Sequence, residues 1–120
     1  MGLDIEVIDK DGNTIDSWRL GAYSSYMDFR REIAVQAGVD LDLMDGHGGT
    51  TPFTEETPLR LILDHSDCNG DYSYDKLNLL EKELEQVLKM KLTPYSKKIA
   101  EIMMGTVHIC RDSGDRILFT

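Results

Sequence analysis

Cysteine, long apolar runs and basic residues are scarce in this chain of 120 residues, and each shortage excludes a class of protein. The 2 cysteines, Cys68 and Cys110, form no CxxC motif and no paired Cys/His spacing, so we expect reduced thiols rather than a disulfide framework. No apolar stretch approaches the roughly 20 residues of a membrane span, and no basic segment followed by an apolar run opens the chain. We therefore expect a cytoplasmic protein without a membrane partner.

The shortage of basic residues limits the partners further. The chain has 22 acidic against 13 basic residues, which gives a formal net charge of -9. Binding along a nucleic-acid backbone depends on Lys and Arg that displace condensed counterions. We therefore do not expect a nucleic-acid polymer as partner, whereas the acidic excess favours solubility and encounter with basic surfaces.

The apolar pattern predicts an α+β fold in a single domain over residues 1–120. Residues 3–8 and 14–20 alternate apolar and polar side chains around an Asp-Gly turn, which predicts an N-terminal β-hairpin. The apolar run 59–63 favours a central buried strand, although the Thr-Pro pair before it could equally cap a short helix. Residues 116–119 read as a C-terminal strand that could pair with the N-terminal sheet.

Three segments carry helical periodicity. Residues 26–37 and 75–90 repeat apolar side chains at helical spacing, and a third helix begins after Thr93 and ends near Gly114. Gly105 in its middle leaves open a hairpin that starts at this glycine. Together the segments predict a small antiparallel sheet (N-terminal hairpin, central strand, C-terminal strand) packed against about three helices.

The polar chemistry concentrates in the loop 65–71, HSDCNGD, which we expect to leave the end of a buried strand. Its alternating Asp and Asn side chains are typical of a calcium loop, but Gly70 falls two places early and Asn78 stands where the closing Glu belongs. A regular EF-hand is therefore excluded. The loop could instead present hydrogen-bonding groups to a polar ligand. Alternatively its Asp and Asn side chains only cap turns, and Ser73 or Asp75 caps the next helix.

Two further chemistries are open for the same loop. As a transition-metal site, His65 and Cys68 with Asp67 could bind zinc, but neighbours this close often point apart and a distant further ligand, His47 or His108, would be required. Cys68 could act as a nucleophile with His65 as its base, although the neighbouring carboxylate of Asp67 disfavours a thiolate. We assign no catalytic residue, no metal ligand and no cofactor.

A second candidate site is the start of the first helix, for which Ser25 is the predicted N-cap and Gly38 the C-terminal stop. A helix start after small residues directs backbone N–H groups outward, where they can hold an anion such as a phosphate. No second or third glycine stands at phosphate-loop spacing.

Four blocks of the sequence carry a resemblance. MGLDI (1–5), WRLGAYSS (18–25) with Arg30 after it, LMDGHGG (43–49) and HSDCNGD (65–71) resemble, in their order, a family of small uncharacterised proteins of bacteriophages and bacteria. The blocks span most of the chain.

Two features depart from the family pattern. The family has Asp and Glu near Asn69 and Asp71, which are conservative differences, and the hairpin around residues 6–17 is less typical. The resemblance implies no known activity. It implies that the segments 21–24 and 65–71 belong to one site, and that the protein has an accessory role of a phage in the host cytoplasm.

The leading functional hypothesis is a non-enzymatic protein that sequesters a small polar, nucleotide-like ligand, such as a host immune signal. In this hypothesis Tyr23 stacks on a base, the Ser24 and Ser25 region caps a phosphate, and Arg30 or Arg31 neutralises it. His65 and Asp67 then hydrogen-bond to polar groups at the edges of the ligand. The predicted ligand-binding residues are Tyr23, Ser24, Ser25, Arg30, His65, Ser66, Asp67, Asn69 and Asp71.

Two alternatives belong to other classes. One is an acidic inhibitor that blocks a basic host protein, and the other is a metal-dependent hydrolase centred on His65, Asp67 and Asp71. A homo-oligomer is compatible with each of these hypotheses. The inhibitor would act through the acidic residues Asp40, Asp42, Asp45, Glu55 and Glu56.

Overall fold

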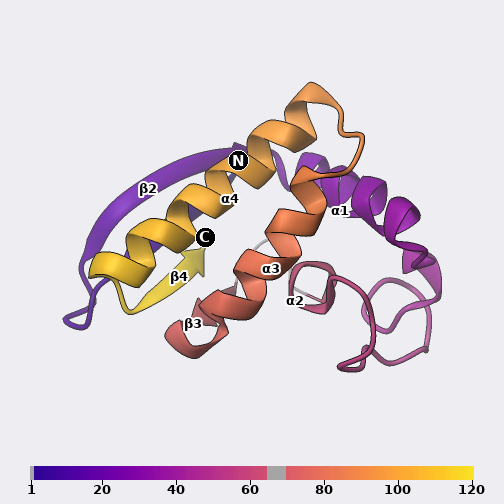
Figure 1. Cartoon of the computed structure of the whole chain (residues 1–120), viewed down its shortest axis with the longest axis horizontal. Helices are drawn as coiled ribbons and strands as arrows, with labels where there is room; N and C mark the ends of the chain where they lie inside the picture. Colours follow the sequence, from indigo (N-terminus) through magenta and orange to yellow (C-terminus); the bar gives the residue numbers. More distant parts are fainter. Residues whose placement is uncertain (1, 65–69) are drawn as a thin grey trace.

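The N-terminal hairpin forms as the alternation predicts. A computed structural model of the chain describes residues 2–64 and 70–120, and in it β1 (Leu3–Ile8) pairs antiparallel with β2 (Thr14–Gly21) (Figure 1). The Asp9 carboxylate closes the turn, because its Oδ1 accepts the N–H groups of Asp11 and Asn13 at 2.9 Å each. The turn therefore uses Asp9 as its cap, and the predicted β-hairpin is confirmed.

The hairpin extends into a four-stranded antiparallel sheet with the order β2-β1-β4-β3. The predicted C-terminal strand, β4 (Arg116–Phe119), pairs with β1. On the other side of β4 lies β3 (Gly70–Ser73), which the sequence did not predict because its residues lie in and directly after the polar loop. The α+β fold with an antiparallel sheet is confirmed, with this additional edge strand.

The favoured central strand over 59–63 is wrong and the alternative of a short helix is confirmed, because residues Arg60–Leu63 form α2, a single helical turn. Leu59, the residue directly before α2, has φ 57°, a left-handed conformation that residues other than glycine seldom adopt. An apolar run of this length carries no periodicity that separates a buried strand from a buried helical turn. Tertiary contacts at both ends of α2 decide the outcome, as described below.

Three longer helices cover the sheet and one another. They are α1 (Tyr23–Ala37), α3 (Leu77–Leu88) and α4 (Pro94–Ser113), with short 3₁₀ turns at Leu41–Leu43 and Tyr74–Lys76. In Figure 1, α4 lies across the sheet and α3 runs beside α4. None of the helices in the described part of the chain is sufficiently long and apolar to cross a membrane.

The helix boundaries test several predictions. Thr93 caps α4 by accepting the N–H of Ser96 at 3.3 Å, and α4 continues through Gly105, so the alternative hairpin at this glycine is wrong. Gly38 ends α1 with φ 79°, as predicted. Ser25 is not the N-cap of α1, because the helix begins at Tyr23 after Ala22.

The last predicted cap also fails, because neither Ser73 nor Asp75 caps a helix through its side chain. Ser73 stands at the start of the 3₁₀ turn, where its hydroxyl donates to the Asp75 carboxylate instead of accepting a backbone N–H group.

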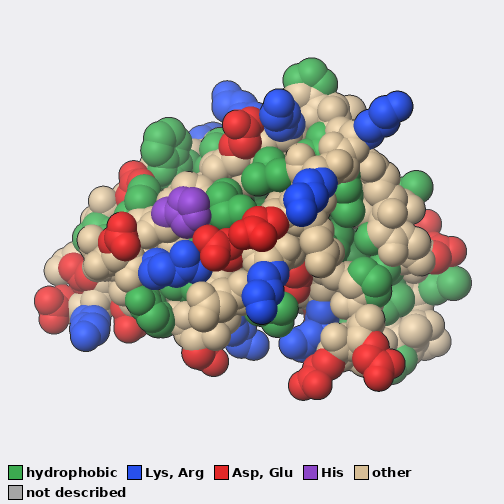
Figure 2. Space-filling view, viewed as in Figure 1, with side chains coloured by type: hydrophobic (Ala, Val, Ile, Leu, Met, Phe, Trp, Pro, Cys, Tyr) green, Lys and Arg blue, Asp and Glu red, His purple; other side chains and the backbone are tan. Residues whose placement is uncertain are grey.

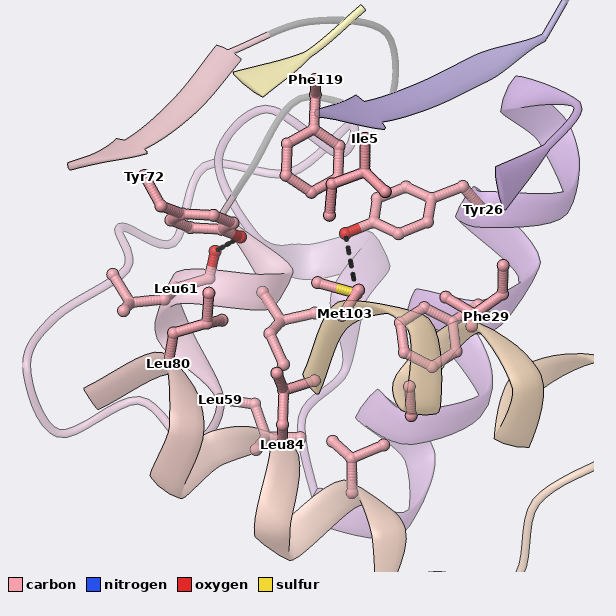
Figure 3. Packing of buried hydrophobic residues seen from close by; sticks show 14 of the residues in the cluster. Ile5, Tyr26, Phe29, Leu59, Leu61, Tyr72, Leu80, Leu84, Met103 and Phe119 are labelled. Atoms are coloured by element: carbon pink, nitrogen blue, oxygen red, sulfur yellow. Dashed lines mark hydrogen bonds between the residues drawn. The ribbon is translucent and has the colours of Figure 1, made fainter. Parts of the chain in front are cut away.

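One hydrophobic cluster joins all layers. Phe119 on β4 lies between two tyrosines, with its ring centroid 5.8 Å from that of Tyr26 on α1 and 5.7 Å from that of Tyr72 on β3 (Figure 3). The other face of the sheet is polar, since the Glu6 carboxylate there accepts hydrogen bonds from Thr14 and Thr120. The sheet is therefore buried on one face and solvated on the other.

Two glycines provide a matched stability test of this fold. Both Gly105 and Gly38 have open space where a Cβ would stand, but only Gly38 has a positive φ. We expect Gly105→Ala to raise the free energy of unfolding by about 1 kcal/mol through helix propensity. Gly38→Ala should lower it by about 1 kcal/mol through left-handed strain. Urea denaturation measures both, and equal effects of the two substitutions would contradict the assigned helix boundaries.

Candidate functional site

The start of α1 is occupied by internal contacts. Tyr23 is half-buried at the edge of the hydrophobic cluster and Ser24 is exposed. The Ser25 hydroxyl hydrogen-bonds the phenol of Tyr95, which itself donates to the Leu20 carbonyl at 2.6 Å. Burial raises the pKa of Tyr95, and the bond from Ser25 partly offsets this rise. Ser25 thus ties α1 to α4.

Arg30 is buried rather than displayed on the surface, with 2% of its area exposed. Its guanidinium lies 5.4 Å from the ring centroid of Tyr26, and its Nη2 is 3.1 Å from the sulfur of Met27. Its Nη1 donates to the Leu63 carbonyl at 3.5 Å. Arg30 therefore connects α1 to the last residue of α2. Arg31 is the exposed neighbour, and it lies 3.8 Å from the Asp42 carboxylate.

The remaining predicted site residues divide into two groups. His65, Ser66, Asp67 and Asn69 lie outside the described residues. Asp71 is exposed on β3, at one edge of the sheet, whereas the Tyr23 segment follows β2 at the opposite edge. Of the predicted residues that the structure describes, Arg30 is the one whose side chain contacts the base of the 65–71 loop.

Sequence reasoning missed Glu83, which binds backbone N–H groups of α2. Glu83 is buried on α3, and its two carboxylate oxygens accept the N–H groups of Leu61 and Ile62 at 3.2 Å each. Burial raises the pKa of Glu83, while these two hydrogen bonds and the charge of Arg60 act in the opposite direction. The sequence did carry a signal, because helical spacing places this carboxylate on the apolar face of α3.

The carbonyl groups of α2 are held as firmly as its N–H groups. The buried Tyr72 hydroxyl donates to the Leu61 carbonyl at 2.6 Å (Figure 3). His47 Nε2 donates to the Leu63 carbonyl at 2.9 Å, and its ring packs edge-on against Phe53. His47 thus has a structural partner, and α2 provides a fixed base for the segment that follows it.

A polar cavity of about 280 Å³ opens beside this base. It carries two acidic and two basic side chains, and its volume lies near the lower end of small-molecule sites. We name it the Asp71 cavity. Its lining residues are Arg60, Leu61, Asp64, Asp71, Tyr72 and Lys76.

A second candidate site lies between the end of α1 and α2. Two neighbouring hollows of about 450 and 390 Å³ share Gly38, Val39 and Asp40. Val35 and Leu43 are strongly exposed here, at 78% and 58%. Figure 2 shows acidic side chains over this loop at the lower right of the molecule. We name as the acidic surface the exposed side chains of Val35, Asp40, Asp42, Leu43, Asp45, Glu55 and Glu56.

The acidic surface stands on an ordered loop. Leu41 and Met44 bury their side chains in the hydrophobic cluster. Backbone hydrogen bonds cross the loop, from the Thr51 N–H to the Leu43 carbonyl at 2.9 Å and from the Asp45 N–H to the Thr51 carbonyl at 2.7 Å. The backbone that carries these side chains is thus held in place before a partner binds, so the ordering cost on binding falls mainly on the side chains.

Within residues 2–64 and 70–120, no three His, Cys, Asp or Glu side chains gather as a metal site. Comparisons with protein-family models, curated proteins and solved structures find no match to this chain. The resemblance to phage and bacterial proteins therefore stays a prediction, and the geometry of the two sites must support a function by itself.

Glu83 and Glu81 on α3 allow a test of whether the carboxylate that binds α2 is buried, because their pKa values shift in opposite directions. Because the pKa of Glu83 is raised in the folded state, wild-type stability should fall as pH rises from about 4.5 through that raised pKa. Glu83→Gln lacks this titration. We therefore expect the free energy of unfolding of Glu83→Gln to increase relative to wild type over that range, measured by urea denaturation at several pH values.

Glu81 is the control with the opposite sign. Its hydrogen bonds from Arg111 and then from His108 lower its pKa below 4.5, so wild type should lose its advantage over Glu81→Gln as pH falls through that lowered pKa. A difference between wild type and Glu83→Gln that is flat with pH, or that follows the Glu81 pattern, would contradict the burial of the Glu83 charge.

Proposed function

We propose that this protein binds a basic protein partner through the acidic surface and blocks the basic surface that it covers. The observation that carries the proposal is the combination of five exposed carboxylates on the loop between α1 and α2 with two hollows and two strongly exposed aliphatic side chains, Leu43 on the same loop and Val35 at the end of α1. Specific protein interfaces combine an apolar centre with a polar rim in this way.

The charge distribution supports a basic rather than an acidic partner. Asp40, Asp42 and Glu56 line the hollows, and Asp45 and Glu55 are exposed on the same loop. Arg31 is the basic residue among the lining side chains of the two hollows. A net charge of -9 accelerates encounter with a cationic surface, and this acceleration weakens as salt screens it.

The apolar side chains of the acidic surface would slow the dissociation of a partner, which charge alone does not. Rim charges mainly set the association rate and specificity, whereas desolvated apolar contacts slow dissociation. Val35 and Leu43 together present aliphatic area that the fold leaves uncovered. A partner segment with Lys or Arg beside Leu or Val side chains therefore matches the surface better than a purely cationic one.

Titration with synthetic peptides tests this preference. Peptides that combine Lys or Arg with Leu or Val should bind, purely cationic peptides should bind more weakly, and acidic analogues should not bind. We expect Asp42→Lys/Glu56→Lys to weaken binding at least tenfold, on the order of 1.4 kcal/mol, by fluorescence anisotropy. Leu43→Ala should weaken it by a smaller factor that is insensitive to salt.

The control variant is Glu85→Lys/Asp112→Lys, which makes the same change in net charge at exposed positions of α3 and α4. It should keep wild-type affinity for the peptides apart from a small long-range effect. An equal loss of affinity in the control would show that net charge, and not the acidic surface, governs binding.

The Asp71 cavity supports a second function, the sequestration of a small polar ligand predicted from the sequence. Arg60 and Lys76 can pair with an anionic group, and Asp64 and Asp71 with cationic or N–H groups. The volume of about 280 Å³ suits a ligand of the size of a nucleobase or an amino acid rather than a dinucleotide.

Retention of small molecules tests this second function. Wild-type protein incubated with a nucleotide and amino-acid extract should retain a ligand detectable by mass spectrometry, and Asp71→Ala/Lys76→Ala should retain at least tenfold less. Lys97→Ala/Glu85→Ala, at exposed positions outside the cavity, is the control. If folded wild-type protein retains nothing, or the cavity variant retains as much as wild type, the second function is wrong.

A further inference from the structure

The edge strand β2 is long and carries no described strand on its outer side. Its eight residues, Thr14–Gly21, pair with β1 alone, and β2 runs along the outer margin of the molecule in Figure 1. Unpaired backbone groups along such an edge can add a strand from another chain. The opposite edge strand, β3, has four residues, and short edges pair poorly.

The side chains of β2 do not protect this edge. The strand contains no proline and no lysine, the residues that commonly block edge pairing. Both of its charged side chains have partners within the chain, since Asp16 accepts from the Trp18 indole at 2.9 Å and Arg19 lies 2.6 Å from Asp4. Between the register shifts at its ends, residues 16–19 pair regularly with residues 4–7 of β1.

A groove of about 410 Å³ runs between this edge strand and α4. Trp18, the single tryptophan of the chain, lines it and is 49% exposed. Its indole is held by Asp16, so little side-chain entropy remains to be lost on binding. Such rigid, half-exposed tryptophans are typical anchors of protein interfaces. The remaining lining residues are Lys98, Glu101, Ile102, Gly105 and Ile109.

The charges around the groove indicate which partner fits. Lys98 and Glu101 line it, and Asp16 and Arg19 lie on the adjoining strand, so both signs balance. Two copies of a chain with a net charge of -9 repel each other over most orientations, and a charge-balanced face avoids that cost. A two-fold interface also requires a surface that is complementary to itself.

We propose that a second copy of this chain docks on β2 and the adjoining groove, and that the two sheets join through antiparallel β2–β2 pairing about a two-fold axis. Facing residues across antiparallel strands point to the same side of the sheet. Since Trp18 and Asp16 share one face, pairing centred on Ser17 sets Trp18 against Asp16 of the other copy, and pairing centred on Trp18 sets the two indoles together. Either register buries Trp18.

The dimer interface is separate from the acidic surface. The acidic surface belongs to the end of α1 and the loop between α1 and α2, whereas the groove belongs to β2 and α4. Dimerisation therefore leaves both acidic surfaces free, so that the assembly presents two of them, and the proposal does not depend on the proposed function.

Concentration-dependent sedimentation velocity and intrinsic fluorescence test the dimer together. Wild type should shift from dimer to monomer on dilution, and the emission of Trp18 should move to longer wavelength over the same concentration range as the indole enters water. A monomer at every concentration, or a dimer whose dilution leaves the emission unchanged, would overturn the proposal.

Gly105→Glu is the discriminating variant. A Cβ at Gly105 would meet no atom within 4 Å, and Gly105 lines the groove, so the substitution adds a negative charge from each copy to the interface. We expect the dimer dissociation constant to rise at least tenfold, while circular dichroism and thermal melting show a folded protein. Leu43→Ala, on the acidic surface, should leave it unchanged. A dimer that Gly105→Glu does not weaken would overturn the assigned interface.

Discussion

The pairing of β1 with β4 joins the two ends of the chain, and the rest of the structure is arranged around it. It sets Ile5 opposite Phe119, and the Phe119 ring then contacts Tyr26 on α1 and Tyr72 on β3. The pairing of Ile5 with Phe119 is among the most distant in sequence that a chain of this length can make, so closing it carries a large loop entropy. The core is therefore completed by the last residues of the chain.

This aromatic centre explains why one short helical turn is held so firmly. Tyr72 is positioned by Phe119 and reaches the Leu61 carbonyl, Glu83 accepts the N–H groups at the start of α2, and His47 donates at its end. Buried polar groups are costly unless they are paired, so each of these bonds matters more than a surface bond would. Two α2 residues, Arg60 and Leu61, line the Asp71 cavity, so these bonds also hold one wall of that cavity in place.

The distribution of charge gives two surfaces different roles. The end of α1 and the loop before α2 combine carboxylates with the exposed side chains of Val35 and Leu43, whereas the groove beside β2 balances both signs around Trp18. A surface of one sign selects a partner of the other sign, and a balanced surface permits self-association. The proposals of a basic partner and of a second copy thus follow from one uneven distribution of the same 35 charged residues, 22 acidic and 13 basic.

The hairpin, the three long helices and the C-terminal strand could be predicted from the sequence because each has a local signal: alternation around the Asp9 turn, apolar stripes, the Thr93 cap. For residues 59–63 the sequence left a strand and a short helix open, because a short apolar run carries no periodicity that separates them. Strand β3 was not predicted, since a polar tetrapeptide adopts the conformation that its neighbours satisfy. For the site, the acidic residues 40–56 were identified from composition, but their apolar centre was not. Arg30, predicted as a ligand contact, is buried because its guanidinium meets the Leu63 carbonyl. The local sequence pattern thus determined which of the longer helices and strands form. Tertiary contacts decided which polar side chains are buried in hydrogen bonds and which remain on the surface, because burial depends on partners far away in the chain.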